Sequence, residues 1–258
     1  MGRKKFTLIL GATLMAALGV TLIAQAAVDT GIVGWWRFNE YSGITANDSS
    51  GFNNNGTLVS TAFFTPDSTR GNVLLINGTA GEVQYPFTTK LQPAVGTISV
   101  WVKPTIAKLA DLIRQPTDML VRSNRAGDWY AYALRVTDKG AVVAIVTNDD
   151  PKYAAKQPQT VMYSSSGLVK PNQWSHLVMR WDGSAVSLFV NGKGSGSARY
   201  AATPNLGLSY HGTAPVKVGA ALWDSKDGYL EFFGMISDLR IFNRVITDTE
   251  AKSIFADQ

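Results

Sequence analysis

The sequence predicts an all-β protein in which antiparallel sheets stack as a sandwich. Many short segments are rich in Val, Ile, Trp, Tyr and Phe, which suit a pleated, half-buried surface. Turn-forming Gly, Asn, Asp and Pro residues separate these segments. No segment between the predicted strands has the apolar spacing of a helix, which argues against a parallel sheet with crossover helices.

The N-terminal residues are predicted to be a signal peptide. A basic stretch at residues 3–5, an apolar run at residues 8–23 and small residues at 24–26 are its typical features. The alternative is a retained membrane anchor, but a bilayer span needs roughly 20 apolar residues, more than this run supplies. We therefore expect cleavage after residue 26, no membrane contact afterwards, and one exported domain over residues 27–258. Its destination is the periplasm, the cell surface or the medium.

The charge of the chain limits which binding partners are expected, and its cysteine content limits how the fold can be stabilised. The formal net charge is +5, but three of the positive charges lie at residues 3–5, which leaves about +2 after cleavage. The remaining Lys and Arg residues are scattered, so we expect no nucleic acid partner. The chain has no cysteine, which excludes disulfides and thiolate metal sites. Its core, alone or with a hard metal ion, must therefore hold the domain together.

The predicted strands follow one another along the chain. They share alternating or continuous apolar residues and lie at 32–38, 73–76, 98–103, 119–122, 130–137, 141–147, 161–164, 174–181, 185–190, 216–219 and 235–242. Asp182-Gly183 and Asn191-Gly192 are typical hairpin turns. Long loops are expected at 107–117, 149–158 and 194–215.

One short helix is predicted at the C-terminus. Thr247 and Glu250, three residues apart, form a capping box, and Ala251, Ile254 and Phe255 give an apolar stripe behind it. The whole pattern therefore predicts two antiparallel sheets followed by a single short helix.

Four sequence blocks carry a family resemblance. They contain GWWRFNE from Gly34 with DSSGFNNNGTL from Asp48, TISVWVKP from Thr97, QWSHLV from Gln173 with WDG from Trp181 and LFVNG from Leu188, and GMISDLRIFNR from Gly234. In this order they resemble the bacterial laminin-G-like domains of the concanavalin A-like lectin/glucanase superfamily, over about residues 31–255. The resemblance implies a jelly-roll sandwich of two curved antiparallel sheets, often with one calcium ion. Its members mostly bind carbohydrate or other surface ligands, and some relatives cleave polysaccharides.

The loop at residues 39–56 is the candidate metal site. Ca²⁺ takes six to eight oxygen ligands, and suitable oxygens are offered by Asn39, Glu40, Asp48 and Asn53. The resemblance adds Asp238, at a position where similar domains carry an acidic residue near the ion. The alternative is that this loop contains ordinary Asx turns. In either case we expect it to act as a structural clip that steadies the N-terminal strand.

Catalytic motifs find little support in the sequence. The glycosidases of this superfamily need paired carboxylates, usually in a Glu-x-Asp-x-x-Glu pattern, which this sequence lacks. His176 is expected to be a packed strand residue. The sequence shows neither a nucleophile elbow nor a phosphate-binding loop, and no organic cofactor is expected.

Glycan binding is the function that these residues favour. Sugar rings stack on exposed aromatic faces while nearby polar groups orient their hydroxyls. One candidate platform consists of Trp129, Tyr130 and Tyr132, and the other of Trp223 and Tyr229. We expect a non-catalytic module for a glycan or another cell-surface ligand. A surface adhesion or protein-interaction domain and a polysaccharide-degrading enzyme are the alternatives.

Overall fold

The computed structural model describes residues 29–77, 81–105, 110–116, 130–148, 158–200, 208, 216–219, 223–224, 228–229 and 232–257. The chain divides into two units, Met1–Gly31 and Ile32–Gln258, and the second contains all the described strands and the described α-helix. The predicted signal peptide at residues 1–26 lies outside the described residues. Among these residues, no helix is both long and apolar enough to cross a membrane.

The first sheet is antiparallel and consists of eight described strands. In spatial order they are β14 (Lys193–Arg199), β13 (Ala185–Val190), β12 (Ser175–Trp181), β7 (Gly96–Pro104), β18 (Gly234–Phe242), β5 (Gly71–Ile76) and β4 (Ala62–Asp67), with β1 (Ile32–Trp36) paired to β18.

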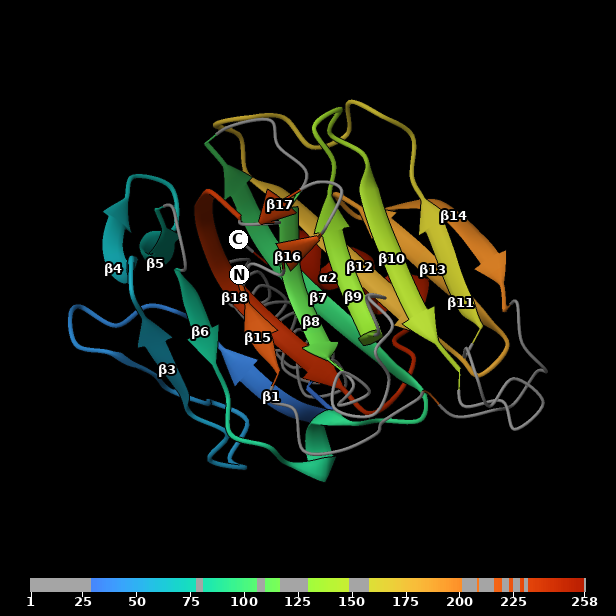
Figure 1. Ribbon diagram of the computed structural model, residues 1–258, viewed down its shortest axis with the longest axis horizontal. Coiled ribbons are helices and arrows are strands. Elements are labelled where there is room, and N and C mark those ends of the chain that lie inside the picture. Colours follow the sequence, from blue (N-terminus) through green and yellow to red (C-terminus); the bar gives the residue numbers. More distant parts are fainter. Residues whose placement is uncertain are drawn as a thin grey trace, which may run out of the picture. The chain divides into compact units, whose positions relative to one another are not determined.

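The second sheet is also antiparallel, and its strands lie in front of the first sheet in Figure 1. Its order is β11 (Gln159–Tyr163), β10 (Val142–Thr147), β9 (Tyr130–Val136), β8 (Ala110–Pro116), β15 (Lys217–Val218), β6 (Glu82–Gln84), β3 (Gly56–Val59) and β2 (Thr45–Ala46). A separate two-stranded ribbon pairs β16 (Trp223–Asp224) with β17 (Gly228–Tyr229). The short helices are η1 (Thr89–Leu91) and α2 (Asp248–Ala256).

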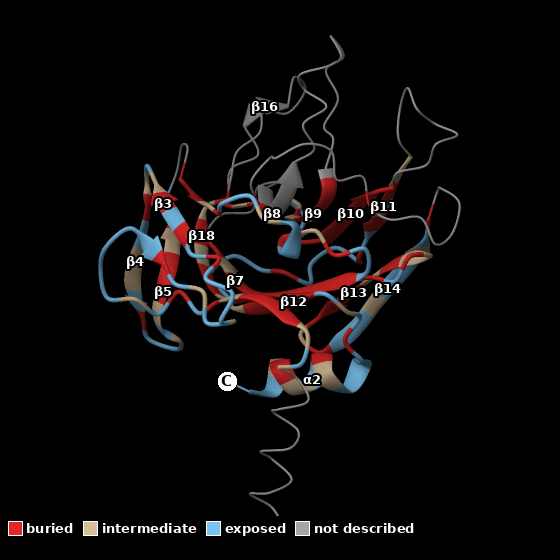
Figure 2. Cartoon of the chain, turned by 90° about the horizontal axis from the view of Figure 1, so that it is seen from below, coloured by how far each residue is buried: buried red, intermediate tan, exposed pale blue. Residues whose placement is uncertain are grey.

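The core lies between the inner faces of the two sheets, as the alternation of apolar residues predicts. Trp36 and Trp181 from the first sheet are fully buried. The ring centroid of Trp36 lies 4.2 Å from that of Tyr85, and the centroid of Trp181 lies 5.4 Å from that of Tyr132. Buried residues accordingly follow the strands of both sheets in Figure 2. The predicted antiparallel sandwich is confirmed.

The turns and the C-terminal helix form where the sequence predicts them. Gly183, Asn191 and Gly192 have φ angles of 89°, 51° and 70°, in the left-handed region that favours Gly and Asn. Thr247 and Glu250 form both bonds of the capping box, so α2 begins at Asp248. Figure 2 shows α2 on the side of the first sheet that faces away from the second sheet.

Two of the predicted loops contain strands instead. The loop predicted at 107–117 contains β8, and the loop predicted at 194–215 begins with β14. β14 is a Gly- and Ser-rich strand that pairs with β13 by backbone bonds, so it lacks the apolar alternation that would predict it. The strand predicted at 119–122 and residues 149–157 of the remaining predicted loop lie outside the described part of the chain.

Candidate functional site

Asp48 clips the long N-terminal loop onto β1. Its Oδ1 accepts hydrogen bonds from the backbone N–H groups of Trp35 and Ser50, both at 2.9 Å. Its Oδ2 accepts from the hydroxyl of Ser50 at 2.7 Å and from the backbone N–H of Asn54 at 2.9 Å. These four bonds use the roughly four lone-pair positions of a carboxylate. In this arrangement Asp48 forms an Asx turn and has no position left for a cation.

Glu40 is differently placed within the same loop. Its Oε1 accepts from the backbone and side-chain N–H groups of Asn47 at 2.7 and 2.9 Å. Its Oε2 is buried and accepts no hydrogen bond from the part of the chain that the structure describes. Asn39 and Asn53, the two amide candidates, are exposed. Among the predicted calcium ligands, Glu40 therefore offers a buried oxygen that an ion could use.

Asp238 lies at a bulge in β18 and has a φ of 50°. Its Oδ1 accepts from the indole N–H of Trp35 at 2.6 Å, and Arg240 donates to both of its oxygens at 3.0 and 2.9 Å. A bidentate guanidinium already neutralises this carboxylate, which does not suit a calcium ligand. No three His, Asp or Glu side chains of the described residues gather in a way that could hold a metal ion.

The aromatic residues predicted to form sugar-binding platforms lie in different parts of the chain. Trp129 lies outside the described residues. Tyr130 begins β9, and Trp223 stands opposite Tyr229 in the β16–β17 ribbon. The prediction that Tyr132 is a surface platform is wrong, because its ring is fully buried against Trp181 and its hydroxyl donates to the carbonyl of Leu91 at 3.2 Å. Burial also raises the pKa of Tyr132.

A groove lies where strands β12, β13 and β14 meet the loop that leads into α2. The sequence does not predict this groove. Its volume is about 370 Å³, against about 210 Å³ for a hollow beside the β9–β10 turn. Ligand pockets usually fall between about 300 and 1,000 Å³. The lining combines polar and apolar side chains: Arg180, Asp182, Ala185, Ser187, Ser197, Val245, Ile246 and Thr247. The groove is therefore large enough for a small polar ligand.

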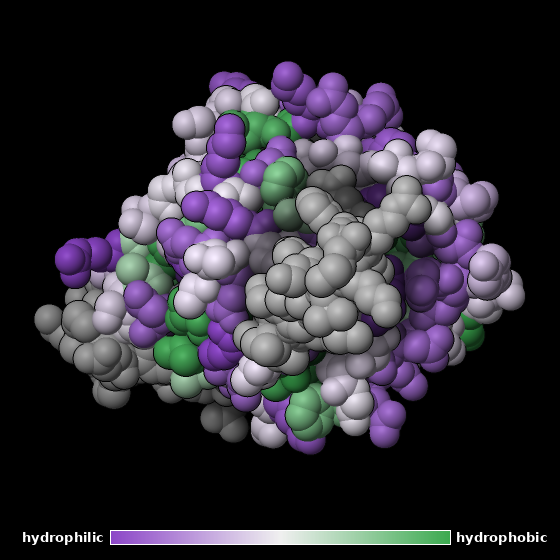
Figure 3. Space-filling view, turned by 180° about the vertical axis from the view of Figure 1, so that it is seen from behind, coloured by the Kyte–Doolittle hydropathy of each residue, from purple (hydrophilic) through white to green (hydrophobic). Residues whose placement is uncertain are grey.

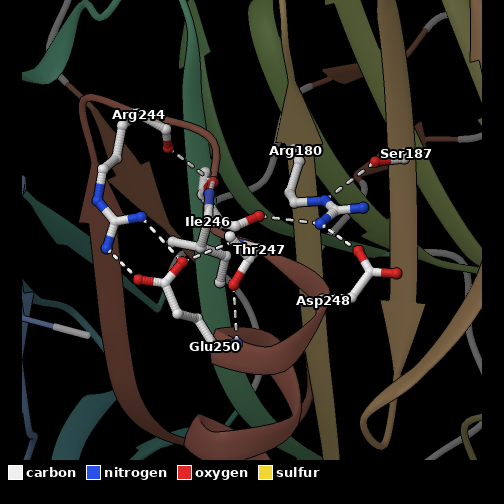
Figure 4. Close-up of polar contacts among 8 residues, drawn as sticks. Arg180, Ser187, Arg244, Ile246, Thr247, Asp248 and Glu250 are labelled. Carbon is white, nitrogen blue, oxygen red and sulfur yellow. Dashed lines mark hydrogen bonds and ion pairs between the residues drawn. The ribbon is translucent and has the colours of Figure 1, made fainter. Parts of the chain in front are cut away.

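Arg180 ties the strands to the loop and the helix (Figure 4). Its Nε donates to the hydroxyl of Ser187 at 3.2 Å, and its Nη1 donates to the carbonyl of Ile246 at 2.9 Å and to Asp248 at 2.8 Å. The guanidinium carbon also lies 4.2 Å from the ring centroid of Phe189. These contacts hold Arg180 in one orientation, so the groove exists before any ligand arrives.

A second arginine fixes the loop from the other side. Arg244 makes two bonds to Glu250, at 3.0 and 2.6 Å (Figure 4). The hydroxyl of Thr97 in β7 donates to the carbonyl of Arg244 at 2.8 Å and accepts from the N–H of Ile246 at 3.1 Å. Burial acts to raise the pKa of Glu250, but hydrogen bonds from Arg244 and Thr247 lower it overall. The carboxylate is thus held in its ionised form.

The groove offers groups that suit sugar hydroxyls. Ser187 and Ser197 supply hydroxyls that can donate and accept. Asp182 uses its Oδ1 for the backbone N–H groups of Ser184 and Ala185, both at 2.8 Å, and its Oδ2 accepts no hydrogen bond from the described residues. Val245, 36% exposed, adds apolar surface. Such a combination can bind the polar edge and the apolar face of a ring together.

Comparison with known proteins identifies the fold. A laminin G family model described as "Concanavalin A-like lectin/glucanases superfamily" matches residues 77–252. No curated protein matches the chain in sequence. Among solved structures, the binding domain of Paraclostridial mosquitocidal protein 1 is 13% identical with a TM-score of 0.63, over 88% of this chain and 52% of that one.

Two further structures are complexes with sugars. Domain 4 of AbnA, an extracellular arabinanase from Geobacillus stearothermophilus, is in complex with arabinotriose; it is 16% identical with a TM-score of 0.57, over 86% of this chain and 97% of that one. The ligand-binding domain of botulinum neurotoxin serotype D, in complex with N-acetylneuraminic acid, is 13% identical with a TM-score of 0.61, over 91% of this chain and 53% of that one. The chain thus spans about half the length of the toxin domains, and identities this low show a shared fold alone.

Proposed function

Because this chain belongs to the laminin G family of the concanavalin A-like lectin/glucanases superfamily, we propose that it is an exported domain that binds a glycan without cleaving it. The groove beside α2 carries this proposal, since hydroxyl and carboxylate groups lie there next to apolar surface. The sugars bound to two structural neighbours support the same class of ligand. Nucleic acid is not an expected partner, because no block of basic residues follows the predicted signal peptide.

A screen of the mature protein on a glycan array tests the proposal. We expect saturable binding to a small group of glycans, followed by recovery of the bound glycan unchanged in mass after prolonged incubation. Absence of binding to every glycan would contradict the carbohydrate-binding role. Recovery of shortened glycans would favour a polysaccharide-degrading enzyme instead.

A surface adhesion or protein-interaction domain is the main alternative. A contiguous exposed apolar patch would favour it. On the face shown in Figure 3, the hydrophobic residues whose placement is described form small separate areas among hydrophilic ones. Of the exposed large apolar residues, Tyr41, Ile44 and Phe52 lie in the loop at 39–56, whereas Phe63 lies in β4 and Tyr163 in β11. The polar groove therefore favours a glycan over a protein partner.

Calcium binding in the loop at 39–56 is a separate proposal. It is supported by Glu40, whose Oε2 is buried without a partner, and by the amide oxygens that Asn39 and Asn53 carry nearby in sequence. The four hydrogen bonds to Asp48 and the Arg240 pair of Asp238 do not fit it. Any ion there would therefore depend on Glu40 and serve a structural role. A higher melting temperature in calcium than in chelator would support it.

A further inference from the structure

The outer face of the first sheet contains a second group of polar side chains, apart from the groove. Trp101, His176 and Arg240 are 3%, 0% and 4% exposed, and each has a nitrogen with no hydrogen-bond partner among the described residues: Nε1, Nδ1 and Nη1 respectively. The Nε of Arg70 is also buried, and no described residue accepts a hydrogen bond from it. A buried donor left unpaired costs about 1–3 kcal/mol, and native proteins contain few of them. The unpaired nitrogens of Arg70, Trp101 and Arg240 are N–H donors, whereas the Nδ1 of His176 donates or accepts according to its tautomer. Three unpaired donors on one face point to an acceptor.

These four side chains are neighbours across the sheet. His176 in β12 stands opposite Trp101 in β7, and their ring centroids are 5.1 Å apart. Arg240 in β18 stands opposite Ser99 in β7, whose hydroxyl contacts the Nε2 of His176 at 2.8 Å. Arg70, in the turn between β4 and β5, places its guanidinium carbon 4.1 Å from the ring centroid of Trp101. The four side chains therefore form one cluster.

The carboxylates beside the cluster are already in use. Asp67 accepts from Lys103 at 2.7 Å, from the indole of Trp174 at 3.0 Å and from the backbone N–H groups of Thr69 and Arg70 at 2.9 and 3.1 Å. The second carboxylate, Asp238, is held by Arg240 and by the Trp35 indole. Neither carboxylate accepts from the unpaired nitrogens.

The charges of the cluster do not balance. Among the side chains that the structure describes here, two carboxylates face three cations, namely those of Arg70, Lys103 and Arg240. His176 adds no charge at neutral pH, because burial lowers its pKa to about 3. One positive charge is therefore left over. A water molecule could satisfy the donors but would leave this charge, whereas an anion provides both acceptors and compensation.

We propose that this cluster binds a small oxyanion, a sulfate, phosphate or carboxylate group, through the N–H groups of Arg70, Trp101 and Arg240. Phe255 of α2 stacks over Trp101 and His176, with ring centroids 5.7 and 6.2 Å away, and so covers the cluster from the helix side. Arg70 is only half-buried, so the anion enters beside it. The group is either a free ion or part of an acidic glycan.

The test measures the thermal unfolding of the mature protein as sulfate or phosphate is titrated against sodium chloride at constant ionic strength. A second arm uses a sulfated oligosaccharide and its desulfated counterpart. We expect a saturable rise in melting temperature with at least one oxyanion. Trp101→Phe keeps the ring but removes the N–H, and Arg70→Gln removes the charge. Each should weaken the apparent affinity by about tenfold or more.

Arg199→Gln is the control. Arg199 is an exposed arginine in β14, the edge strand of the first sheet, so this variant removes a cation outside the cluster. It should leave the response to oxyanions unchanged. If Trp101→Phe fails to fold, Arg70→Gln and anomalous diffraction from crystals grown with selenate provide the same test.

The outcomes separate the sources of the oxyanion. A response to free sulfate or phosphate alone supports a structural ion, and a response to the sulfated oligosaccharide alone supports recognition of an acidic glycan. The proposal is overturned if no oxyanion stabilises the protein beyond chloride, or if Arg70→Gln and the Arg199 control respond equally. In that case buried water satisfies the donors.

Discussion

The indole N–H of Trp35 donates to the carboxylate of Asp238 at 2.6 Å, and this bond joins the first described strand to the last. Arg240 holds the same carboxylate, and its guanidinium carbon lies 4.6 Å from the ring centroid of Trp35. The backbone N–H of Trp35 in turn donates to Asp48. Trp35 is therefore the residue at which the N-terminal loop, β1 and β18 are connected.

Replacing Asp238 tests this connection. Asp238→Asn leaves the side chain of Arg240, only 5% exposed, without its counter-charge. We expect the free energy of unfolding in urea to fall by about 3–5 kcal/mol. Asp138→Asn, a change at an exposed turn, should cost less than about 0.5 kcal/mol. A loss for Asp238→Asn that occurs in calcium but vanishes in chelator would instead identify Asp238 as an ion ligand.

The role of Asp48 can be distinguished from that of Glu40. Because Asp48 accepts four hydrogen bonds, Asp48→Ala should lower the melting temperature equally in millimolar calcium and in chelator. Glu40→Gln should remove any stabilisation by calcium while changing the chelator value little. If Asp48→Ala is the variant that removes the calcium effect, then Asp48 binds the ion and the Asx-turn interpretation is insufficient.

Stability at acid pH should depend on Asp67. Burial acts to raise its pKa, but bonds from Lys103, the Trp174 indole and two backbone N–H groups lower it from 3.8 to about 2. A lowered pKa gives stability that is complete above about pH 4 and is lost as the pH falls towards 2. Asp67→Asn should therefore lower the free energy of unfolding at neutral pH by about 2 kcal/mol.

The measurement is urea unfolding of Asp67→Asn and wild type between pH 2 and 7, and the two curves should converge at the acid end. Asp138→Asn should run parallel to wild type throughout. Curves for Asp67→Asn that stay equally far apart down to pH 2 would show that the carboxylate's charge is not what stabilises the fold.

The start of α2 should depend on the hydroxyl of Thr247. Thr247→Ala removes the cap of the helix and should cost about 1 kcal/mol, whereas Thr247→Ser keeps the oxygen and should cost much less. Urea unfolding of the two variants measures the difference. An equal cost for both would mean that packing of the threonine methyl group, not the cap, stabilises the helix.

The local features of the fold could be predicted because each depends on residues close in sequence. The turns at Asp182-Gly183 and Asn191-Gly192 and the Thr247–Glu250 capping box are such features. The position of Tyr132 also follows from residues close in sequence, although we predicted it to be exposed. It alternates with Leu134 and Val136, all buried in the core, and this alternation already placed its ring inside. Polar neighbours in sequence therefore do not show that an aromatic side chain is exposed.

The groove could not be predicted because its parts meet only after folding. Arg180 contacts Ile246 and Asp248 across 66 and 68 residues of sequence. An arginine on the outer face of a strand usually faces water, and nothing near Arg180 in sequence indicates that a loop covers it. Similarly, the loop pattern suggests Asp48 as an ion ligand and the family resemblance adds Asp238, whereas the structure supplies each with a hydrogen-bond donor that lies far away in sequence.

Titration calorimetry of the glycan selected on the array tests the central claim most directly. The double variant Ser187→Ala/Ser197→Ala removes two hydrogen bonds to the ligand, each of about 0.5–1.5 kcal/mol. Its dissociation constant should therefore rise about tenfold or more. Ser195→Ala, on the same strand as Ser197 and bonded to the carbonyl of Lys193 at 3.1 Å, should bind like wild type. Equal affinity in all three proteins would show that the glycan binds elsewhere and would contradict the assignment of the groove.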